Sequence, residues 1–313
     1  MIKKILVRLL RDPFRKFIGV ELIISKQNEL KRDLITQRHE IDRVFSKIEA
    51  MIIDKNQMSM SRKNIQFQQL IPILSPMDIS GAKYKRFGRD HDGGYIMLDN
   101  FQAQPIEAAY SFGISDDVSW DLEIANLGIE VFMYDHTIKK LPKSNPRFHF
   151  FQEGVSGDPQ QSNLDTLTNY IVRNGHQNSN NLILKMDIEG HEWSVLTQTS
   201  SAVIGQFQQI VIELHGLDPN KSKNDWSNII RILEKINLTH QSIHVHANGS
   251  CPISWFGDLA LPHFLEVTYV RRSDYTDKFI QNSRLFPTEI DQPTFPWVPD
   301  VYLGTFTTET KES

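Results

Sequence analysis

The sequence predicts an α/β fold, a mainly parallel sheet with helices on both faces, preceded by an α-helical coiled coil. Three observations lead to this prediction. Short apolar runs alternate with helical stretches after residue 80, which is typical of strand-helix-strand crossover units. Several of these runs end in a carboxylate or a glycine. Before them, apolar residues recur with a period of seven, which favours a coiled coil.

Size and composition limit the class of protein. The chain has 313 residues, 40% hydrophobic and 23% charged, enough for one large domain and an additional segment. Its net charge of −4 indicates no obligate polyanionic partner. The single cysteine, Cys251, excludes an internal disulfide, so we expect a cytoplasmic protein. Basic residues recur throughout the first 25 positions, which argues against a signal peptide or a spanning helix.

Residues 1–58 are predicted to be helical. The opening helix carries basic side chains and one apolar face, formed by Ile2, Ile5, Leu6, Leu9 and Leu10. Such a helix can rest on the inner face of an anionic membrane or pack on a neighbouring subunit. A heptad repeat then has apolar residues at eight of ten core positions: Val20, Gln27, Leu34, Ile41 and Ile48 at a, and Ile23, Leu30, Gln37, Val44 and Met51 at d. The repeat predicts a homo-oligomer with two, three or four chains.

The remainder divides into three parts. Residues 59–80 are polar and end in a segment with Pro72 and Pro76, so we expect a linker. The main domain is predicted over residues 81–272. Residues 273–313 are rich in proline and aromatics, and we expect a tail that is held against the domain and has a floppy end.

Eight segments of the main domain are predicted strands: "YIML", "AAYSFGI", "EVFMYD", "FHFFQEG", "LILKMD", "QIVIELHG", "HQSIHVHA" and "FLEVTYV". Four predicted helices lie between them: "VSWDLEIANLG", "NLDTLTNYIVRNG", "HEWSVLTQTS" and "DWSNIIRILEKIN". In an open α/β sheet, ligands bind beyond the carboxyl ends of the strands. The informative strand ends are therefore Gly113, Asp135, Asp187 and Glu213.

The turn "SFGISDD" is the first of these strand ends. The chain has neither a G-x-G-x-x-G nor a G-x-x-x-x-G-K-[ST] motif. Asp116 and Asp117 stand where a helix N-terminus would otherwise attract phosphate. They oppose a dinucleotide and suit S-adenosylmethionine, which has an adenosine and a positive centre but no phosphate; alternatively, they only cap the helix. Asp135 ends the next strand, about 20 residues after Gly113, a spacing at which an acidic residue can take the ribose hydroxyls.

The ends of two further strands predict a metal site. Asp187 follows "LILKM", and Glu213 and His215 lie at the end of "QIVIELH", two residues apart and so on one face. Adjacent parallel strands lie about 4.8 Å apart, so Asp187 and Glu213 can share one divalent cation. His246, on the same face of its strand as His244, is a further candidate ligand. Oxygen ligands with one or two imidazoles favour Mg²⁺ or Mn²⁺ over zinc.

Six motifs in order resemble the FkbM-type family of S-adenosylmethionine-dependent methyltransferases, in its methyltransferase-like branch. They are "YKRFGRDHDGGYIML", "YSFGISDDVSWDLEIA", "NLDTLTNYI", "NLILKMDIEGHEWSVL", "QIVIEL" and "HVHANG … LPHFLEVTYVRR", over about residues 84–272. The resemblance implies a Rossmann-like methyltransferase sheet. It implies three sets of contacts with the cofactor: Ser111, Phe112, Gly113 and Ser115 with the methionine part, Asp135 with the ribose, and Gly154, Val155 and Ser156 with the adenine. His136 and Asp187 are further predicted cofactor contacts. Metal-dependent relatives take carboxylates at the positions of Asp187 and Glu213.

One departure from those relatives concerns the general base. Gly190 stands where some of them carry it, so the base comes from elsewhere, and His215, His246 and His191 are candidates. Lys185, the lysine of the strand motif, is a further candidate catalytic residue. The "DGGY" stretch, residues 92–95, is a lid, an edge hairpin or only a tight turn.

The predicted reaction is methyl transfer to a hydroxyl, assisted by a divalent metal. The resemblance favours a saccharide or glycolipid acceptor, such as a surface polysaccharide, and a macrolide or other secondary metabolite is the nearest alternative. A coiled-coil scaffold without catalysis is a rival from another class. A nucleic-acid substrate is disfavoured, because the domain lacks interleaved basic and aromatic residues.

Overall fold

The computed structural model describes residues 57–160, 162–218, 226–256 and 259–307, and nine residues between positions 26 and 44. Those nine, namely 26, 30, 37, 38 and 40–44, are helical. The predicted membrane-binding helix and most of the heptad repeat lie outside the described residues. The coiled coil, the homo-oligomer and the membrane contact therefore stay predictions. No described helix has the length and apolar character to cross a membrane.

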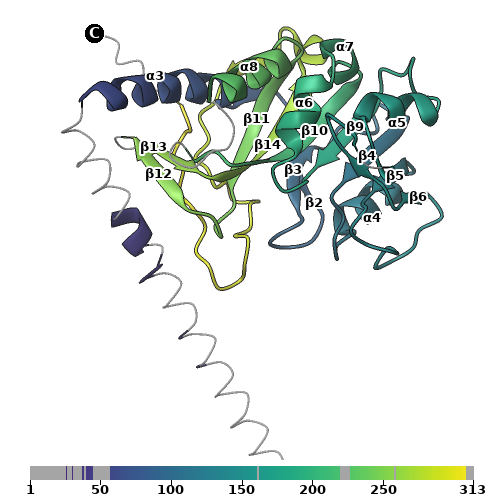
Figure 1. The fold of residues 1–313 in the computed structure, drawn as a ribbon, viewed down its shortest axis with the longest axis horizontal. Coiled ribbons are helices and arrows are strands. Elements are labelled where there is room, and N and C mark those ends of the chain that lie inside the picture. Colours follow the sequence, from purple (N-terminus) through teal and green to yellow (C-terminus); the bar gives the residue numbers. More distant parts are fainter. Residues whose placement is uncertain are drawn as a thin grey trace, which may run out of the picture.

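A seven-stranded sheet forms the centre of the molecule (Figure 1). Its order is β11-β14-β10-β9-β4-β5-β6, and all neighbouring pairs from β10 to β6 are parallel. Strand β14 is antiparallel to both β10 and β11. This confirms the mixed α/β fold with a mostly parallel sheet. The strands are β4 Ala108–Phe112, β5 Glu130–Tyr134, β6 Phe148–Phe151, β9 Leu182–Met186, β10 Phe207–His215, β11 His240–Ala247 and β14 Phe264–Arg271.

Helices cover both faces of the sheet, as predicted. On one face α4, Ser119–Asn126, packs with the hairpin of β2, Tyr84–Phe87, and β3, Tyr95–Leu98, around one apolar cluster. The other face carries a larger cluster, formed with α3 Gln57–Leu74, α5 Leu167–Arg173, α6 Glu192–Gln198, α7 Ser201–Ile204 and α8 Trp226–Asn237. Every residue of β9 and β10 is buried, because a parallel sheet covered on both faces leaves its central strands no contact with water.

Helix α3 corrects the linker predicted over residues 59–80. Its apolar residues Phe67, Leu70, Ile71 and Leu74 are buried and have the spacing i, i+3, i+4 and i+7, which places them on one helical face. This face packs on the sheet beside α8, where the Asn237 amide donates to the carbonyl of Ile73 at 2.8 Å. The polar residues between them hid this stripe in the sequence.

The C-terminal segment, described as far as residue 307, is held along the domain. A short helical turn, η1 Arg272–Tyr275, leads into β15 Phe279–Gln281, which pairs with β1 Met77–Ile79. Two further short pairs, β7 Gly154–Val155 with β8 Leu164–Asp165 and β12 Ile253–Phe256 with β13 Leu259–Pro262, complete the described strands. Two carboxylates of the tail bind histidines of β11: the buried Asp291 lies 2.9 Å from His244, and the half-buried Asp300 lies 3.1 Å from His246.

Candidate active site

The turn after β4 packs directly against the end of β9. Gly113 has a φ of +79°, and a Cβ at this position would overlap the carbonyl oxygen of Asp187. Only glycine combines this backbone conformation with such a close approach. Lys185 of β9 holds the turn from below, since its ammonium donates to the Gly113 carbonyl at 2.8 Å.

Asp135, which ends β5, fixes the same turn. One carboxylate oxygen accepts from the backbone N–H groups of Ile114 and Ser115, at 2.9 and 2.8 Å. The other accepts from the N–H and the hydroxyl of Thr137, at 2.7 and 2.6 Å. Burial alone would raise the pKa of this carboxyl, but these hydrogen bonds outweigh it and lower the pKa. Four accepted bonds occupy the lone pairs of the carboxylate, so the contact with a ribose stays a prediction that requires Thr137 or the turn to move.

A cavity of about 610 Å³ opens above this turn. Among the predicted cofactor contacts, the cavity is lined by Phe112, Gly113, Ser115, Asp135, His136, Gly154, Val155, Ser156 and Asp187. Ser111 is fully buried beneath it. The absence of a side chain at Gly154 makes room for the ring of His136, whose Nδ1 would lie 2.5 Å from a Cβ there. The size suits a ligand as large as S-adenosylmethionine.

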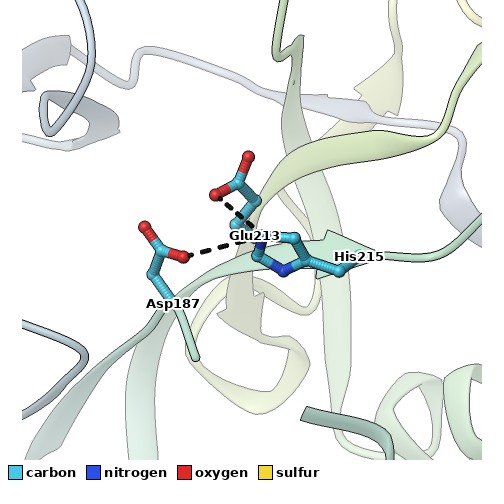
Figure 2. A group of neighbouring side chains, drawn as sticks. All are labelled: Asp187, Glu213 and His215. Atoms are coloured by element: carbon cyan, nitrogen blue, oxygen red, sulfur yellow. Dashed lines mark ion pairs between the residues drawn. The ribbon is translucent and has the colours of Figure 1, made fainter. Parts of the chain in front are cut away.

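Asp187, Glu213 and His215 form a cluster at the edge of this cavity (Figure 2). One ligand atom from each lies within 4.8 Å of the other two. His215 Nε2 is 3.5 Å from Glu213 Oε2 and 4.0 Å from Asp187 Oδ1. The carboxyl ends of β9 and β10 thus bring together the two carboxylates that the sequence predicted to share a cation. Asp187 belongs both to the cluster and to the cavity wall.

Two residues that the sequence analysis did not select hold these carboxylates. The Tyr95 hydroxyl donates to Asp187 Oδ2 at 3.1 Å, and the Asn248 amide donates to Glu213 Oε1 at 2.8 Å. Tyr95 comes from the "DGGY" stretch, which is therefore a turn whose tyrosine reaches the site. Asn248 comes from the turn after β11, and no local pattern marked it.

The cluster is rich in uncompensated negative charge. Burial and the neighbouring carboxylates of Asp187 and Glu266 raise the pKa of Glu213 well above its usual range. For His215, burial acts to lower the pKa, but the hydrogen bond and charge of Glu192 and the charge of Asp187 raise it overall. Two carboxylates and an imidazole, held together with a surplus of negative charge, form a donor set that fits Mg²⁺ or Mn²⁺.

Glu192 links the cluster to the backbone around it. This carboxylate is fully buried, and its Oε1 accepts from the N–H groups of Ile188 and Gly190, at 2.9 and 3.3 Å. The same oxygen lies 3.1 Å from His215 Nδ1. The sequence analysis missed this role, although Glu192 belongs to the "DIEGHEW" motif and a glutamate in the first turn of a helix is a recognisable signal.

The other candidate catalytic residues are not members of the cluster. His246 does not join it, because its ring nitrogens face Glu266 at 3.0 Å and Asp300 at 3.1 Å. The residue that the structure brings together with Asp187 and Glu213 is His215, which the sequence analysis selected as a candidate base, and not His246, which it selected as a ligand. His191 is exposed and lines the cavity. Lys185 lines the floor of the cavity.

Residues 108–238 match the family described as the methyltransferase FkbM domain. This chain therefore contains an FkbM methyltransferase domain. The FkbM domain includes the Gly113 turn, Asp135 and all three residues of the cluster, whereas Tyr95 and Asn248 lie outside it. The family match supports methyltransferase chemistry for this domain.

Two solved structures share a weak likeness with the chain. A candidate hemolysin from Streptococcus thermophilus is 9% identical, with a TM-score of 0.31 over 65% of this chain and 74% of that one. A variant of the 16S rRNA (adenine(1408)-N(1))-methyltransferase from Catenulisporales acidiphilia is 10% identical, with a TM-score of 0.27 over 63% of this chain and 100% of that one. No curated protein matches the chain.

Proposed function

We propose that the chain is an S-adenosylmethionine-dependent O-methyltransferase that uses a divalent cation and modifies a hydroxyl of a saccharide or glycolipid. The observation that carries the proposal is the position of Asp187. This residue lines the cavity suited to the methyl donor and also belongs to the cluster suited to the cation. An acceptor oxygen bound at the cluster would therefore lie next to the methyl donor, and such proximity supplies a large part of the rate enhancement.

The main chemical obstacle is that an alcohol is a weak nucleophile near neutral pH. A bound Mg²⁺ or Mn²⁺ would lower the pKa of the acceptor hydroxyl, and S-adenosylmethionine would supply the methyl group. Asp187 and Glu213 would hold the cation, with His215 as third donor. Glu192 fixes the His215 ring when Nδ1 carries the proton, which leaves the lone pair of Nε2 facing the two carboxylates.

A proton acceptor is also needed at the reacting oxygen. We assign this role to His191, because it lines the cavity and is exposed, whereas the ring nitrogens of His246 face carboxylates. The Tyr95 hydroxyl keeps Asp187 in place by binding Oδ2, so that Oδ1 faces His215. The saccharide class rests on the family resemblance.

A transfer assay with labelled S-adenosylmethionine tests the proposal. A panel of saccharide and macrolide acceptors is incubated with the protein before chelation, after exhaustive chelation, and after Mn²⁺ is restored. We expect labelled saccharide, loss of labelling on chelation, and recovery with Mn²⁺. Glu213→Gln should reduce the rate at least a hundredfold, while Glu130→Gln, a matched change at an ion pair on the surface, should leave it unchanged.

Other outcomes would point to other functions. Activity that survives both chelation and Glu213→Gln would show a methyltransferase that acts by proximity alone, without metal. If only the macrolides are labelled, the acceptor is a secondary metabolite and not a saccharide. A protein that binds no S-adenosyl ligand and labels nothing would be a scaffold.

A further inference from the structure

Three polar side chains meet in the wall beneath the Gly113 turn, within an otherwise apolar layer. Ser111 of β4 and Lys185 of β9 are register partners on adjacent parallel strands, so they point to the same face. Asp121, from the first turn of α4, is close enough to both to interact with them. All three are buried, with exposed fractions of 0%, 6% and 1%. Asp121 and Lys185 also line the cavity of about 610 Å³.

The hydrogen-bonding capacity of this group is only partly used. Among the described residues, no partner lies within hydrogen-bond distance of Asp121 Oδ1 or of the Ser111 hydroxyl. The Lys185 ammonium has three N–H groups, and one of them donates to the Gly113 carbonyl. Burial raises the pKa of Asp121 to about 6, and the charge of Lys185 and the nearby Ser111 hydroxyl, which lies close to the carboxyl without full hydrogen-bond geometry, offset only part of this effect. A buried carboxylate with an unpartnered oxygen is costly unless a ligand completes it.

We propose that Asp121 and Lys185 bind the amino-acid end of the S-adenosyl ligand, with Asp121 accepting from its ammonium group and Lys185 donating to its carboxylate. The inference rests on the proposed function, since it requires an S-adenosyl ligand in this cavity. An α-amino acid end carries one positive and one negative group about one carbon apart. A buried anion beside a buried cation is complementary to that pair of charges. The Ser111 hydroxyl lies beside this pair of charged side chains.

Two ligands that differ in the amino-acid end test the contact with Asp121 and Lys185. S-adenosylhomocysteine carries the amino-acid end, and 5′-methylthioadenosine has the same adenosine and a thioether without it. We expect Asp121→Asn to weaken S-adenosylhomocysteine binding by roughly ten- to a hundredfold, because a charged hydrogen bond is lost. Binding of 5′-methylthioadenosine should stay within about twofold of the wild type. Isothermal titration measures both affinities without catalysis.

Glu130→Gln is the matched control. It also replaces a carboxylate by an amide, but Glu130 forms an ion pair with Arg147 on the surface and does not line the cavity, so this change should not distinguish the two ligands. If Asp121→Asn weakens both ligands equally, or neither, Asp121 serves only the fold and the proposal is overturned. If the wild-type protein binds neither ligand, the proposed function fails as well.

The wild type provides a second test in case Asp121→Asn does not fold. Wild-type affinity for S-adenosylhomocysteine should exceed that for its deaminated analogue, which lacks only the ammonium group, by at least tenfold. Equal affinities would show that the ammonium group has no charged partner, which contradicts the assignment of Asp121.

Discussion

At the scale of single residues, four carboxylates of this site have the same chemistry and different surroundings. Asp135 accepts four hydrogen bonds from the chain itself and fixes a turn. Glu213 accepts a hydrogen bond from the Asn248 amide and faces other carboxylates. Asp121 Oδ1 has no partner among the described residues. Glu192 binds backbone and histidine through Oε1, and its Oε2 likewise has no partner among the described residues. What distinguishes Glu213 and Asp121 is their position, since Glu213 belongs to the cluster and Asp121 lines the cavity.

The first prediction concerns Glu192→Gln. A glutamine whose carbonyl oxygen replaces Oε1 keeps the three contacts with Ile188, Gly190 and His215 but removes the negative charge. We expect about a tenfold loss of Mn²⁺ affinity, because partners behind a metal-ligating histidine contribute on this scale. Titration with Mn²⁺ measures the affinity, and ¹⁵N shifts of the His215 ring report which nitrogen carries the proton.

Asp291→Asn provides the comparison for Glu192→Gln. It alters another buried carboxylate-histidine pair, between the tail and His244, and should lower stability without changing Mn²⁺ affinity. If the Mn²⁺ affinity and the ¹⁵N shifts of the His215 ring are unchanged in Glu192→Gln, the role of Glu192 is only to bind the backbone of the turn before α6.

At the scale of elements, the position of each ligand group follows from where a strand ends. Strands β9 and β10 are parallel neighbours, so Asp187 and Glu213 emerge at the same edge. The turn after β4 reaches the same edge, because β4 is the other neighbour of β9. The hairpin of β2 and β3 and the turn after β11 then add Tyr95 and Asn248 from more distant parts of the chain.

Helix α3 supplies a prediction at this scale. Leu70 is fully buried between α3 and the body of the domain, so Leu70→Ala should lower the free energy of unfolding by about 2–5 kcal/mol. Gln69→Ala, at the adjacent exposed position, should change it by less than about 0.5 kcal/mol. Urea unfolding of both variants is the measurement. If both variants change the free energy of unfolding by a similarly small amount, α3 does not pack on the domain and the segment is a linker, as the sequence predicted.

At the scale of the whole molecule, acid stability depends on a histidine in the core. Burial lowers the pKa of His240 to about 4 from its usual 6.5, and the ring lies 2.9 Å from the Phe207 carbonyl. The unfolded chain binds a proton near pH 6.5, whereas the folded chain binds it only near pH 4. The stability that the neutral ring confers is therefore complete above about pH 6.5 and is lost as the pH falls toward 4.

The comparison with His240→Gln isolates this effect, since the amide can donate to the same carbonyl but does not titrate. Between pH 7.5 and pH 5, the free energy of unfolding should fall by about 2 kcal/mol more in the wild type than in the variant. Urea unfolding at the two pH values gives both quantities. If the two proteins lose stability in parallel, the ring is not buried in its neutral form.

Much of this molecule could be predicted from the sequence, because strand and helix periodicity are local properties. The strands, the helices between them, and the carboxylates that end β9 and β10 are all visible as patterns of a few residues. Asp135, Asp187 and Glu213 lie at one edge of the sheet, as predicted, since crossover units return each strand in the same direction. The predicted linker was wrong because polar residues masked the apolar stripe of α3.

The sequence by itself determined the sheet, the FkbM signature and the identity of the two clustered carboxylates. Only the tertiary structure decided which histidine joins them, what fixes each side chain, and that Asp121 and Lys185 share the wall of the cavity. The physical reason is the distance along the chain between the residues that interact. A strand end is specified by neighbours along the chain, whereas a hydrogen bond such as Tyr95 to Asp187, or His246 to Asp300, depends on segments that meet only after the whole sheet has formed.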